Sequence, residues 1–383
     1  MKNNPLVSVI LPSYNGSKYI QESIESILKQ SFTDFELILV DDCSSDNTLS
    51  IMNEYAELDE RITVIHNDHN CKLPGALNVG MSYAKGKFLT WSSDDNFYDR
   101  DAFRIMTTEL LSELDSTAMV TCRYRIWNIN ENGDVVAESI SDIYDEGFFY
   151  IHNIVGACFM YRSEVVDKIG LYDTSAFCAE DYDYWLRIYS EIGRIKFIDK
   201  VLYTYRQHPD NLTATKKKEI FIQTYRVLEK YSDKWLIEYK NKPDKLMCLY
   251  YMSVMSEGEK TFRIRATIKE RLPILNEERF DFDVNERFTI WGCGDLGRKT
   301  AKLLRDKELV FIDTDLNKIG STVDGIVVRG IESIKNVQDM PVIIAVRTES
   351  VYSVISKLDS LGISFFYTVW GLISVGKVEQ LLW

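Results

Sequence analysis

The sequence has few of the residues that mark fibrous, disordered or disulfide-bonded proteins. Only 7 prolines and 19 glycines occur in 383 residues, which excludes collagen-like and low-complexity chains. The 7 cysteines include no C-x-x-C pair, so we expect neither a disulfide framework nor a zinc site. No uninterrupted apolar run approaches the roughly 18 residues that a membrane span requires.

Basic residues are also scarce relative to acidic ones. The chain has 45 Lys and Arg against 58 Asp and Glu, a net charge of −13. Nucleic-acid binding requires basic residues that displace counterions from phosphate, so we expect no nucleic-acid partner. Residues 1–5 lead directly into a strand-like run, so we expect no signal peptide and a cytoplasmic protein. Contact with the inner face of the membrane and a homo-oligomer are both compatible with the sequence.

The composition, 45% apolar and 27% charged, is that of a globular protein with two or three domains. In the first part of the chain, buried strand patterns alternate with helical patterns. The strand-like runs are residues 7–11, 35–40, 62–65 and 88–91. This alternation predicts a doubly wound α/β sheet.

Two further parts follow this first domain, which we assign to residues 1–215. Residues 216–280 are rich in Lys and Glu and show no strand pattern, which predicts a helical connector. The alternation of strands and helices resumes over residues 281–383. We predict that this last part is a second, small Rossmann-like α/β domain.

Polar residues follow three strands of the first domain. They are Pro12 to Asn15 after the first strand, Asp41 and Asp42 after the second, and Asp94 and Asp95 after the fourth. Any one of these groups alone is as well explained by a turn or a helix cap. Three groups at the carboxyl edge of one parallel sheet indicate a ligand site.

The residue types at this edge indicate what it binds. Carboxylates without clustered Cys or His select Mg²⁺ or Mn²⁺, which take further ligands from substrate phosphates and water. A diphosphate-bearing substrate is therefore expected. Tyr14 is placed to stack on a nucleotide base, and Asp42 to accept a hydrogen bond from a ring N–H such as that of uracil.

Three segments together resemble the ordered motifs of family 2 glycosyltransferases. They are residues 7–15, 40–48 and 89–96, and the resemblance extends over about residues 5–210. It implies the nucleotide-diphospho-sugar transferase fold known as GT-A. It also implies an inverting transferase that uses a nucleotide-activated sugar and a divalent metal.

The resemblance assigns roles at the strand ends. The nucleotide-sugar-binding residues that it implies are Pro12, Tyr14, Asn15, Asp42 and Asp94, with Asp94 facing the ribose or diphosphate. Asp95 would ligate the metal. Residues 72–78 resemble the segment that runs under the nucleotide, where many members have Arg at the position of Leu77. Lys72 is a candidate substitute for that contact, but a solvated lysine is the favoured explanation.

Gly156 resembles a glycine in the family's loop that passes close to the donor sugar, where the missing side chain leaves room. An ordinary glycine that enters a strand is the alternative. His208 lies near a position where related transferases use a His as a metal ligand or diphosphate contact. The alternative for His208 is a histidine in an exposed loop.

Residues 180–187 resemble the family's segment that begins with Glu-Asp, in which the Asp is the general base. Direct displacement requires a carboxylate that takes the proton from the acceptor hydroxyl, while the metal stabilises the leaving diphosphate. Asp181 is therefore the predicted base, with Glu180 and Asp183 as neighbouring alternatives. Apart from the resemblance, acids at the start of a helix also simply favour the helix dipole.

A second motif lies in the last domain. Gly292, Gly294 and Gly297 follow a strand and open a helix, and Asp313 ends the next strand. This is the context of a dinucleotide fingerprint, with phosphate at the helix N-terminus and Asp313 on a ribose hydroxyl. NAD or another nucleotide is the ligand considered. The domain is too short for a complete two-half dinucleotide fold, so a structural or partner-docking role is open as well.

The predicted function is transfer of a sugar, with UDP-sugar as the commonest donor, to a hydroxyl of a glycan or lipid-linked acceptor in bacterial surface polysaccharide synthesis. Two alternatives are open. One is an NAD-dependent sugar-modifying oxidoreductase or epimerase, which would need a catalytic set after Gly297 that the sequence does not contain. The other is a non-catalytic scaffold that binds sugar nucleotides, against which the retained acids Asp42, Asp94, Asp95 and Asp181 count.

Overall fold

The computed structural model describes residues 4–112, 117–141, 149–150, 153–253, 258–272, 287–337, 341–361, 363 and 366–368. Parts of the predicted connector (254–257 and 273–280) and the first residues of the predicted third part (281–286) lie outside the described residues. The chain divides into two compact units, Met1–Val227 and Leu228–Trp383. Each unit is described by itself, and the division into three domains stays a prediction.

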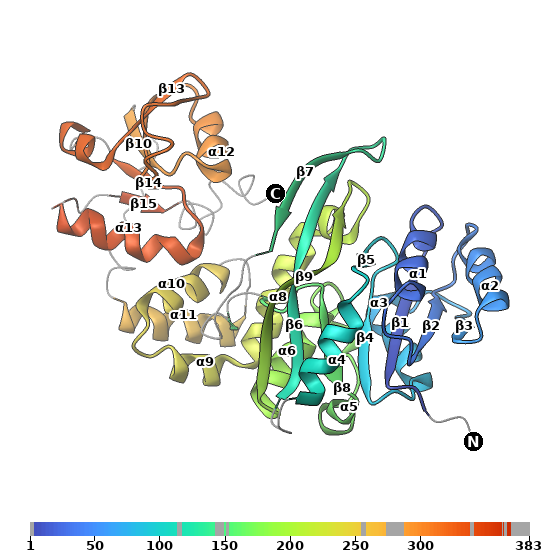
Figure 1. The fold of residues 1–383 in the computed structure, drawn as a ribbon. Helices are drawn as coiled ribbons and strands as arrows, with labels where there is room; N and C mark the ends of the chain where they lie inside the picture. Colours follow the sequence, from blue (N-terminus) through green and yellow to red (C-terminus); the bar gives the residue numbers. More distant parts are fainter. Residues whose placement is uncertain are drawn as a thin grey trace. The chain divides into compact units, whose positions relative to one another are not determined.

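A nine-stranded sheet forms the first unit (Figure 1). One half of it is parallel, in the order β3-β2-β1-β4. These strands are β1 (Val7–Ser13), β2 (Phe35–Asp41), β3 (Ile62–His66) and β4 (Phe88–Trp91). All four strands occur where the sequence pattern predicts them.

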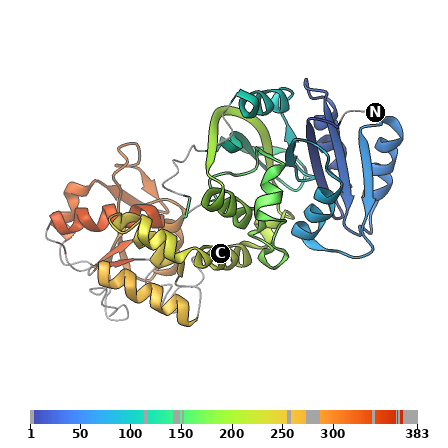
Figure 2. The ribbon, with the colours of Figure 1, turned by 90° about the horizontal axis from the view of Figure 1, so that it is seen from below.

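Helices cover both faces of this parallel half (Figure 2). Val9 and Leu11 of β1 belong to a core that includes side chains of α1 (Ile20–Leu28) and α2 (Thr48–Leu58). Ile10 points to the other face, where a Cβ on Gly80 of α3 would lie 2.5 Å from its Cγ2. Because strand side chains alternate between faces, burial on both sides requires the continuous apolar runs seen in the sequence.

Helix α3 spans Lys72–Tyr83 and begins two residues before Pro74. The side chain of Asn70 accepts a hydrogen bond from the Lys72 amide (3.0 Å) and thereby helps to start the helix. Pro74 lies in the first turn, where its missing N–H removes no intrahelical bond. Proline therefore does not delay the helix here.

The other half of the sheet contains both parallel and antiparallel pairings, and it returns the chain to the edge where the parallel strands end. Its strands are β8 (Phe159–Arg162), β6 (Thr117–Ile129), β9 (Arg194–Gln207), β5 (Phe97–Tyr98) and β7 (Val135–Ile140). A turn at residues 130–133 joins β6 to β7 as a hairpin. The sequence pattern did not predict strand β9. The end of β9 pairs with β5, where Thr204 lies opposite Phe97. This pairing brings residues 205–208 beside the acidic loop after β4.

The helices of the first unit continue with α4 (Ala102–Ser112), α5 (Glu164–Ile169), α6 (Glu180–Glu191) and α7 (Leu212–Thr215). Helix α8 (Lys217–Lys230) spans the division between the units. The second unit then begins with α9 (Ser232–Glu238), α10 (Pro243–Met252) and α11 (Glu259–Arg271). Of the helices in the described residues, none is long and apolar enough to cross a membrane.

The second unit contains a smaller sheet in the order β12-β13-β11-β10-β14-β15. The strands are β10 (Arg287–Trp291), β11 (Glu308–Ile312), β12 (Thr322–Val323), β13 (Ile326–Arg329), β14 (Val342–Ile344) and β15 (Phe366–Thr368). All pairings except β12 with β13 are parallel. Two α-helices connect strands in this part, α12 (Asp295–Leu303) and α13 (Thr348–Ser360). This arrangement is a small, mostly parallel α/β sheet, and its assignment as a Rossmann-like domain stays a prediction.

Candidate functional site

The carboxyl ends of β1, β2 and β4 meet at one edge of the first sheet. The Asp42 amide after β2 donates to the carbonyl of Ser13 at the end of β1 (2.8 Å). The Ser13 hydroxyl donates a short hydrogen bond to Asp94 Oδ2 after β4. Three segments that are distant in sequence are thus joined by hydrogen bonds at this edge.

Asp94 is packed against the loop after β1. A Cβ on Gly16 would lie 1.9 Å from Asp94 Oδ2, so this carboxylate occupies the space that the missing side chain leaves. Burial, together with the charge of Asp95, raises the pKa of Asp94 to about 7, although the Ser13 hydrogen bond opposes the shift. A cation or a phosphate-bound metal at this position would favour the ionised form.

Asp95 faces His208, which the end of β9 delivers. The His208 Nε2 and Asp95 Oδ2 atoms are 3.2 Å apart, and both side chains are largely buried. His208 is therefore not an exposed loop histidine. The second oxygen of Asp95, Oδ1, is buried and has no hydrogen-bond partner among the described residues.

This pair is compatible with a divalent cation. Adjacent ligands of an octahedral ion with bonds of about 2.1 Å lie about 3 Å apart, close to the separation of Nε2 and Oδ2. The unpartnered oxygen of Asp95 offers a further acceptor. Within the described residues, no group of three or more His, Cys, Asp or Glu side chains has metal-binding geometry. An ion at Asp95 and His208 would accordingly take its other ligands from substrate oxygens and water.

The segments around Asp42 hold its carboxyl in a fixed position. Asp42 is 3% exposed, and its Oδ1 accepts hydrogen bonds from Asn67 Nδ2 and from the Cys71 amide, both at 2.8 Å. Tyr14 is 53% exposed, so its ring is accessible, whereas Pro12 is buried within β1. The ring of Tyr14 and the fixed carboxyl of Asp42 thus come from adjacent strand ends.

The loops after β1 and β2 are tied to each other. Asn15 Oδ1 accepts from the Ser45 amide at 2.8 Å, and the Asn15 amide donates to the Ser44 hydroxyl at 2.9 Å. Non-glycine residues with positive φ at the ends of site segments are Asn15 (56°), Cys43 (66°), Lys72 (64°) and Cys178 (76°). Such strained conformations persist where the surrounding structure enforces them, and they are frequent at functional sites.

Asp181 lies in the first turn of α6 and is half-buried. Its Oδ2 accepts from Asn153 Nδ2 (2.7 Å), and its Oδ1 from the Tyr182 amide (2.6 Å). Burial nevertheless raises the pKa of Asp181 above its ordinary value. A carboxylate with a raised pKa is a better proton acceptor, so this environment suits a general base.

Glu180, the neighbour of Asp181, is 4% exposed. Burial and then the charge of Asp181 raise the pKa of Glu180 to about 8, and its Oε2 has no hydrogen-bond partner in the described part of the chain. Asp183 forms an ion pair with Arg187 at 3.0 Å. Among the three acids of this turn, Asp181 is the half-buried one, while Glu180 and Asp183 are enclosed.

Gly156 has a φ of +65°, and a Cβ there would lie 2.3 Å from the ring of Tyr124. Its missing side chain therefore makes room for this tyrosine and for the left-handed backbone. Leu77 is fully buried in α3 and makes no polar contact with a ligand from that position. Lys72 is exposed at the start of the same helix.

The second glycine motif has the backbone geometry of a fingerprint loop. A Cβ on Gly297 would lie 1.8 Å from the Gly292 carbonyl oxygen, whereas the space next to Gly294 is open. Asp313, however, is engaged within its own unit. Its Oδ2 accepts from the Cys293 amide (3.2 Å) and lies 3.5 Å from Lys318 Nζ. Its Oδ1 accepts from the Asp315 amide (3.0 Å).

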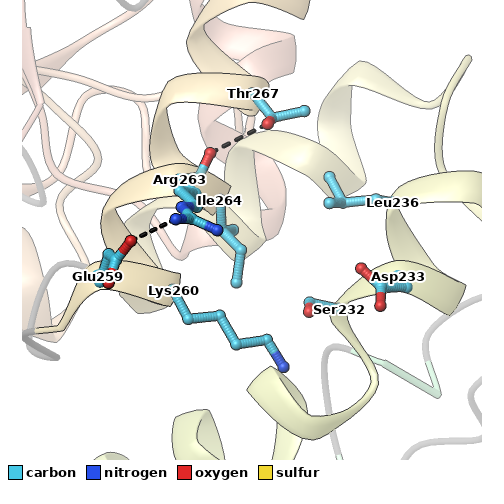
Figure 3. Close-up of a pocket in the computed structure, with 8 residues that line it drawn as sticks. All are labelled: Ser232, Asp233, Leu236, Glu259, Lys260, Arg263, Ile264 and Thr267. Atoms are coloured by element: carbon cyan, nitrogen blue, oxygen red, sulfur yellow. Dashed lines mark hydrogen bonds and ion pairs between the residues drawn. The ribbon is translucent and has the colours of Figure 1, made fainter.

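A hollow of about 590 Å³ lies in the second unit between α9 and α11 (Figure 3). Its residues are Ser232, Asp233, Leu236, Glu259, Lys260, Arg263, Ile264 and Thr267. Both basic side chains are already engaged: Arg263 forms an ion pair with Glu259, and Lys260 donates to the Glu229 carbonyl (2.6 Å). The hollow therefore does not present a pair of uncommitted cations to an anionic ligand.

Several residues that support the site were not singled out from the sequence. They are Ser13 and Gly16 at Asp94, Asn67 and Cys71 at Asp42, and Asn153 at Asp181. A signal existed for Gly16, since a glycine directly after a motif strand often permits close approach. The others lie in loops whose contacts depend on the tertiary fold.

Comparison with known proteins identifies the family of this chain. Residues 8–170 match the family model for glycosyl transferase family 2. A relative from Rickettsia prowazekii (strain Madrid E), the uncharacterized glycosyltransferase RP339, is 30% identical over 245 residues, which are 61% of this chain and 73% of the relative. The chain belongs to glycosyl transferase family 2. Both the predicted family and the predicted α/β GT-A fold are confirmed, while the nature of the appended unit stays a prediction.

Two other relatives of this family 2 member are longer than the matched region. The uncharacterized glycosyltransferase EpsJ of Bacillus subtilis (strain 168) is 30% identical over 55% of this chain and 63% of EpsJ. Chondroitin synthase of Escherichia coli is 31% identical over 57% of this chain and 31% of the synthase. Among solved structures, S. aureus TarS 1–349 in complex with UDP is 20% identical, with a TM-score of 0.46, over 73% of this chain and 94% of that one.

Proposed function

We propose that this protein transfers a sugar from a nucleotide-diphosphate donor to a hydroxyl of a glycan or lipid-linked acceptor, with inversion at the anomeric carbon. The observation that carries the proposal is the convergence of Asp42, Asp94 and Asp95 at one sheet edge. Family membership supports the reaction class. The relatives named as polysaccharide synthases support a role in bacterial polysaccharide synthesis.

The donor nucleotide binds along the ends of β1 and β2 in this proposal. Tyr14 offers an exposed ring for stacking on the base, and Asn67 and the Cys71 amide hold the Asp42 carboxyl in a fixed orientation. A carboxyl fixed in this way is suited to accept the N–H of uracil. UDP-sugar is therefore the proposed donor.

Asp95 and His208 would hold the divalent cation, Mn²⁺ or Mg²⁺, with Asp94 beside them. When bound, the ion supplies Lewis-acid stabilisation of the departing diphosphate. Asp181 takes the proton of the acceptor hydroxyl while the acceptor oxygen forms a bond to the anomeric carbon. The bond from that carbon to the diphosphate oxygen breaks, and the nucleoside diphosphate leaves with the electron pair. Asn153 and the Tyr182 amide hold the Asp181 carboxylate for this step.

The second unit is proposed to have a structural or docking role. The carboxylate of Asp313 is used to hold the Cys293 amide of its own loop, so it is not presented to a ribose. An oxidoreductase or epimerase activity would require that presentation. We place the protein in the cytoplasm, at the inner face of the membrane where lipid-linked acceptors would be found.

The test is Asp181→Asn in the full chain. We expect turnover with a UDP-sugar panel to fall by roughly 10³-fold or more, because the acceptor proton loses its acceptor. The Kd for UDP measured by calorimetry with Mn²⁺ should stay within about threefold, since Asp181 does not touch the nucleotide. Normal turnover of this variant would refute the assignment of the base.

A further inference from the structure

The ring of His208 lies against a second aromatic ring. The centroids of the His208 and Tyr19 rings are 5.1 Å apart, and their planes are inclined by 48°. Tyr19 immediately precedes α1, so it reaches the site from a different segment than either Asp95 or His208. Its hydroxyl is buried and has no hydrogen-bond partner within the described residues. The ring, and not the hydroxyl, makes the contact.

Tyr19 is itself held by a buried cation. The Arg206 guanidinium carbon lies 4.6 Å from the centroid of the Tyr19 ring, within the range of a cation–π contact. The Arg206 side chain is 6% exposed and forms an ion pair with Glu22 of α1 at 2.5 Å. The Arg206 amide also donates to Asn96 Oδ1 at 2.7 Å, next to Asp95.

These contacts form one continuous chain from α1 to the imidazole. Glu22 fixes Arg206, Arg206 packs on Tyr19, and Tyr19 packs on His208. A ligating histidine contributes fully to metal affinity only when its ring orientation is held by surrounding groups. In the described part of the chain, the packed ring of Tyr19 is in a position to restrain the orientation of the imidazole.

We propose that Tyr19 is a positioning residue that orients the His208 imidazole toward a divalent cation shared with Asp95. The inference rests on the metal pair of the proposed function. Tyr19 itself does not touch the ion or the donor. Tyr19 therefore affects the affinity for the metal and the coordination of the metal by His208. The Arg206–Glu22 pair in turn holds the ring of Tyr19 in place.

The experiment measures Mn²⁺ binding to the full chain in the presence of UDP by electron paramagnetic resonance. Tyr19→Leu should raise the Kd for Mn²⁺ by about 10-fold or more, the usual effect of losing such a supporting group. Tyr19→Phe should stay within about twofold, because the hydroxyl has no partner to lose. Glu22→Gln, which leaves the tyrosine in place, should give an intermediate rise. Tyr83→Leu, at a 52% exposed tyrosine on α3, is the matched control and should not change the Kd.

Spin-echo modulation from an imidazole nitrogen gives a second readout, independent of turnover. We expect it in the parent chain and in Tyr19→Phe, and a reduced signal in Tyr19→Leu. Unchanged Mn²⁺ affinity and modulation in both Tyr19→Leu and Glu22→Gln would overturn the inference. Asp95→Asn distinguishes an error in the role of Tyr19 from an error in the metal site. If this variant also keeps the parent affinity for Mn²⁺, then the metal site of the proposed function is wrong, not only the role of Tyr19.

Discussion

The loops after β1 and β10 begin alike but use their glycines differently. Each follows a buried parallel strand and leads into a helix. In the first unit, the missing side chain of Gly16 makes room for Asp94, a carboxylate from another strand end. In the second unit, the missing side chain of Gly297 makes room for the carbonyl of Gly292, which belongs to the same loop. Gly16 therefore permits a contact within the candidate site, whereas Gly297 permits the packing of its own turn.

The acids of the two units differ in the same sense. Asp95 Oδ1 and Glu180 Oε2 are buried without a hydrogen-bond partner in the described structure, and the pKa values of Asp94 and Glu180 are raised. Burial alone would also raise the pKa of Asp313, but hydrogen bonds from the amide of Asp315 and from Cys293 outweigh it and lower the pKa. Unsatisfied, perturbed acids indicate a ligand site, whereas a satisfied acid indicates a structural role.

The largest expected contrast comes from removing one carboxylate at each edge. Asp95→Asn should reduce Mn²⁺-dependent sugar transfer by roughly 10²–10³-fold or more, because the cation loses a charged ligand. Asp313→Asn should leave initial rates unchanged at a temperature where both variants are folded. Rates with the UDP-sugar panel, measured across Mn²⁺ concentrations, compare the two. A large loss in Asp313→Asn would mean that the second unit takes part in the reaction.

The second contrast uses one glycine from each loop. Gly16→Ala would place a Cβ 1.9 Å from Asp94 Oδ2 and so displace that carboxyl, for which we expect a roughly 10- to 100-fold lower kcat/KM. Gly294→Ala is the matched control, since the space beside Gly294 is open. Steady-state kinetics of both variants give the comparison. Equal activity of the two would show that the position of Asp94 does not matter.

The alternation of strands and helices in the first unit could be predicted from the sequence, because buried parallel strands require continuous apolar runs. The grouping of Asp42, Asp94 and Asp95 also followed from topology, since the carboxyl ends of parallel strands share an edge. The end of β9 could not be placed in this way. Its approach to Asp95 depends on the pairing of Phe97 with Thr204, which links residues far apart in the sequence.

The hydrogen bonds that hold the individual acids could not be predicted from sequence patterns either. Asn153 and Asn67 lie in loops without regular periodicity, and each acts on an acid that is distant in sequence. Asp313 shows a different limit of sequence patterns. Its spacing from Gly297 fits a dinucleotide fingerprint, yet the side chain is turned to the Cys293 amide. Spacing places a carboxyl near a loop but does not determine its hydrogen-bond partner.

A smaller effect is expected on the stability of the second unit. Gly297→Ala would place a Cβ 1.8 Å from the carbonyl oxygen of Gly292. We therefore expect the free energy of unfolding to fall by about 1–3 kcal/mol. Gly294→Ala should change it by less than about 0.5 kcal/mol. Hydrogen exchange of β10 and α12 under mild denaturant measures this unit separately from the first. Similar protection in both variants would contradict the close approach of helix and strand.

The smallest effects are changes in stability with pH, and they should have opposite signs for Glu180 of the first unit and Asp313 of the second. The pKa of Glu180 is raised to about 8, so the folded chain keeps a proton that the unfolded chain releases above its ordinary pKa. The native state therefore loses stability as pH rises toward 8, and Glu180→Gln should gain Tm relative to the parent between pH 5 and pH 9.

The lowered pKa of Asp313 has the reverse consequence. Its ionised form stabilises the folded chain at neutral pH, and this contribution is lost only as pH falls below the ordinary aspartate pKa and through the lowered folded value. Asp313→Asn should accordingly have a lower Tm than the parent at pH 7, with a difference that shrinks toward pH 3. Calorimetry measures the Tm of Glu180→Gln between pH 5 and pH 9 and the Tm of Asp313→Asn between pH 3 and pH 7. If the two Tm differences changed with pH in the same direction, then the contrast between the unsatisfied Glu180 and the satisfied Asp313 would not hold, because a single electrostatic environment would describe both.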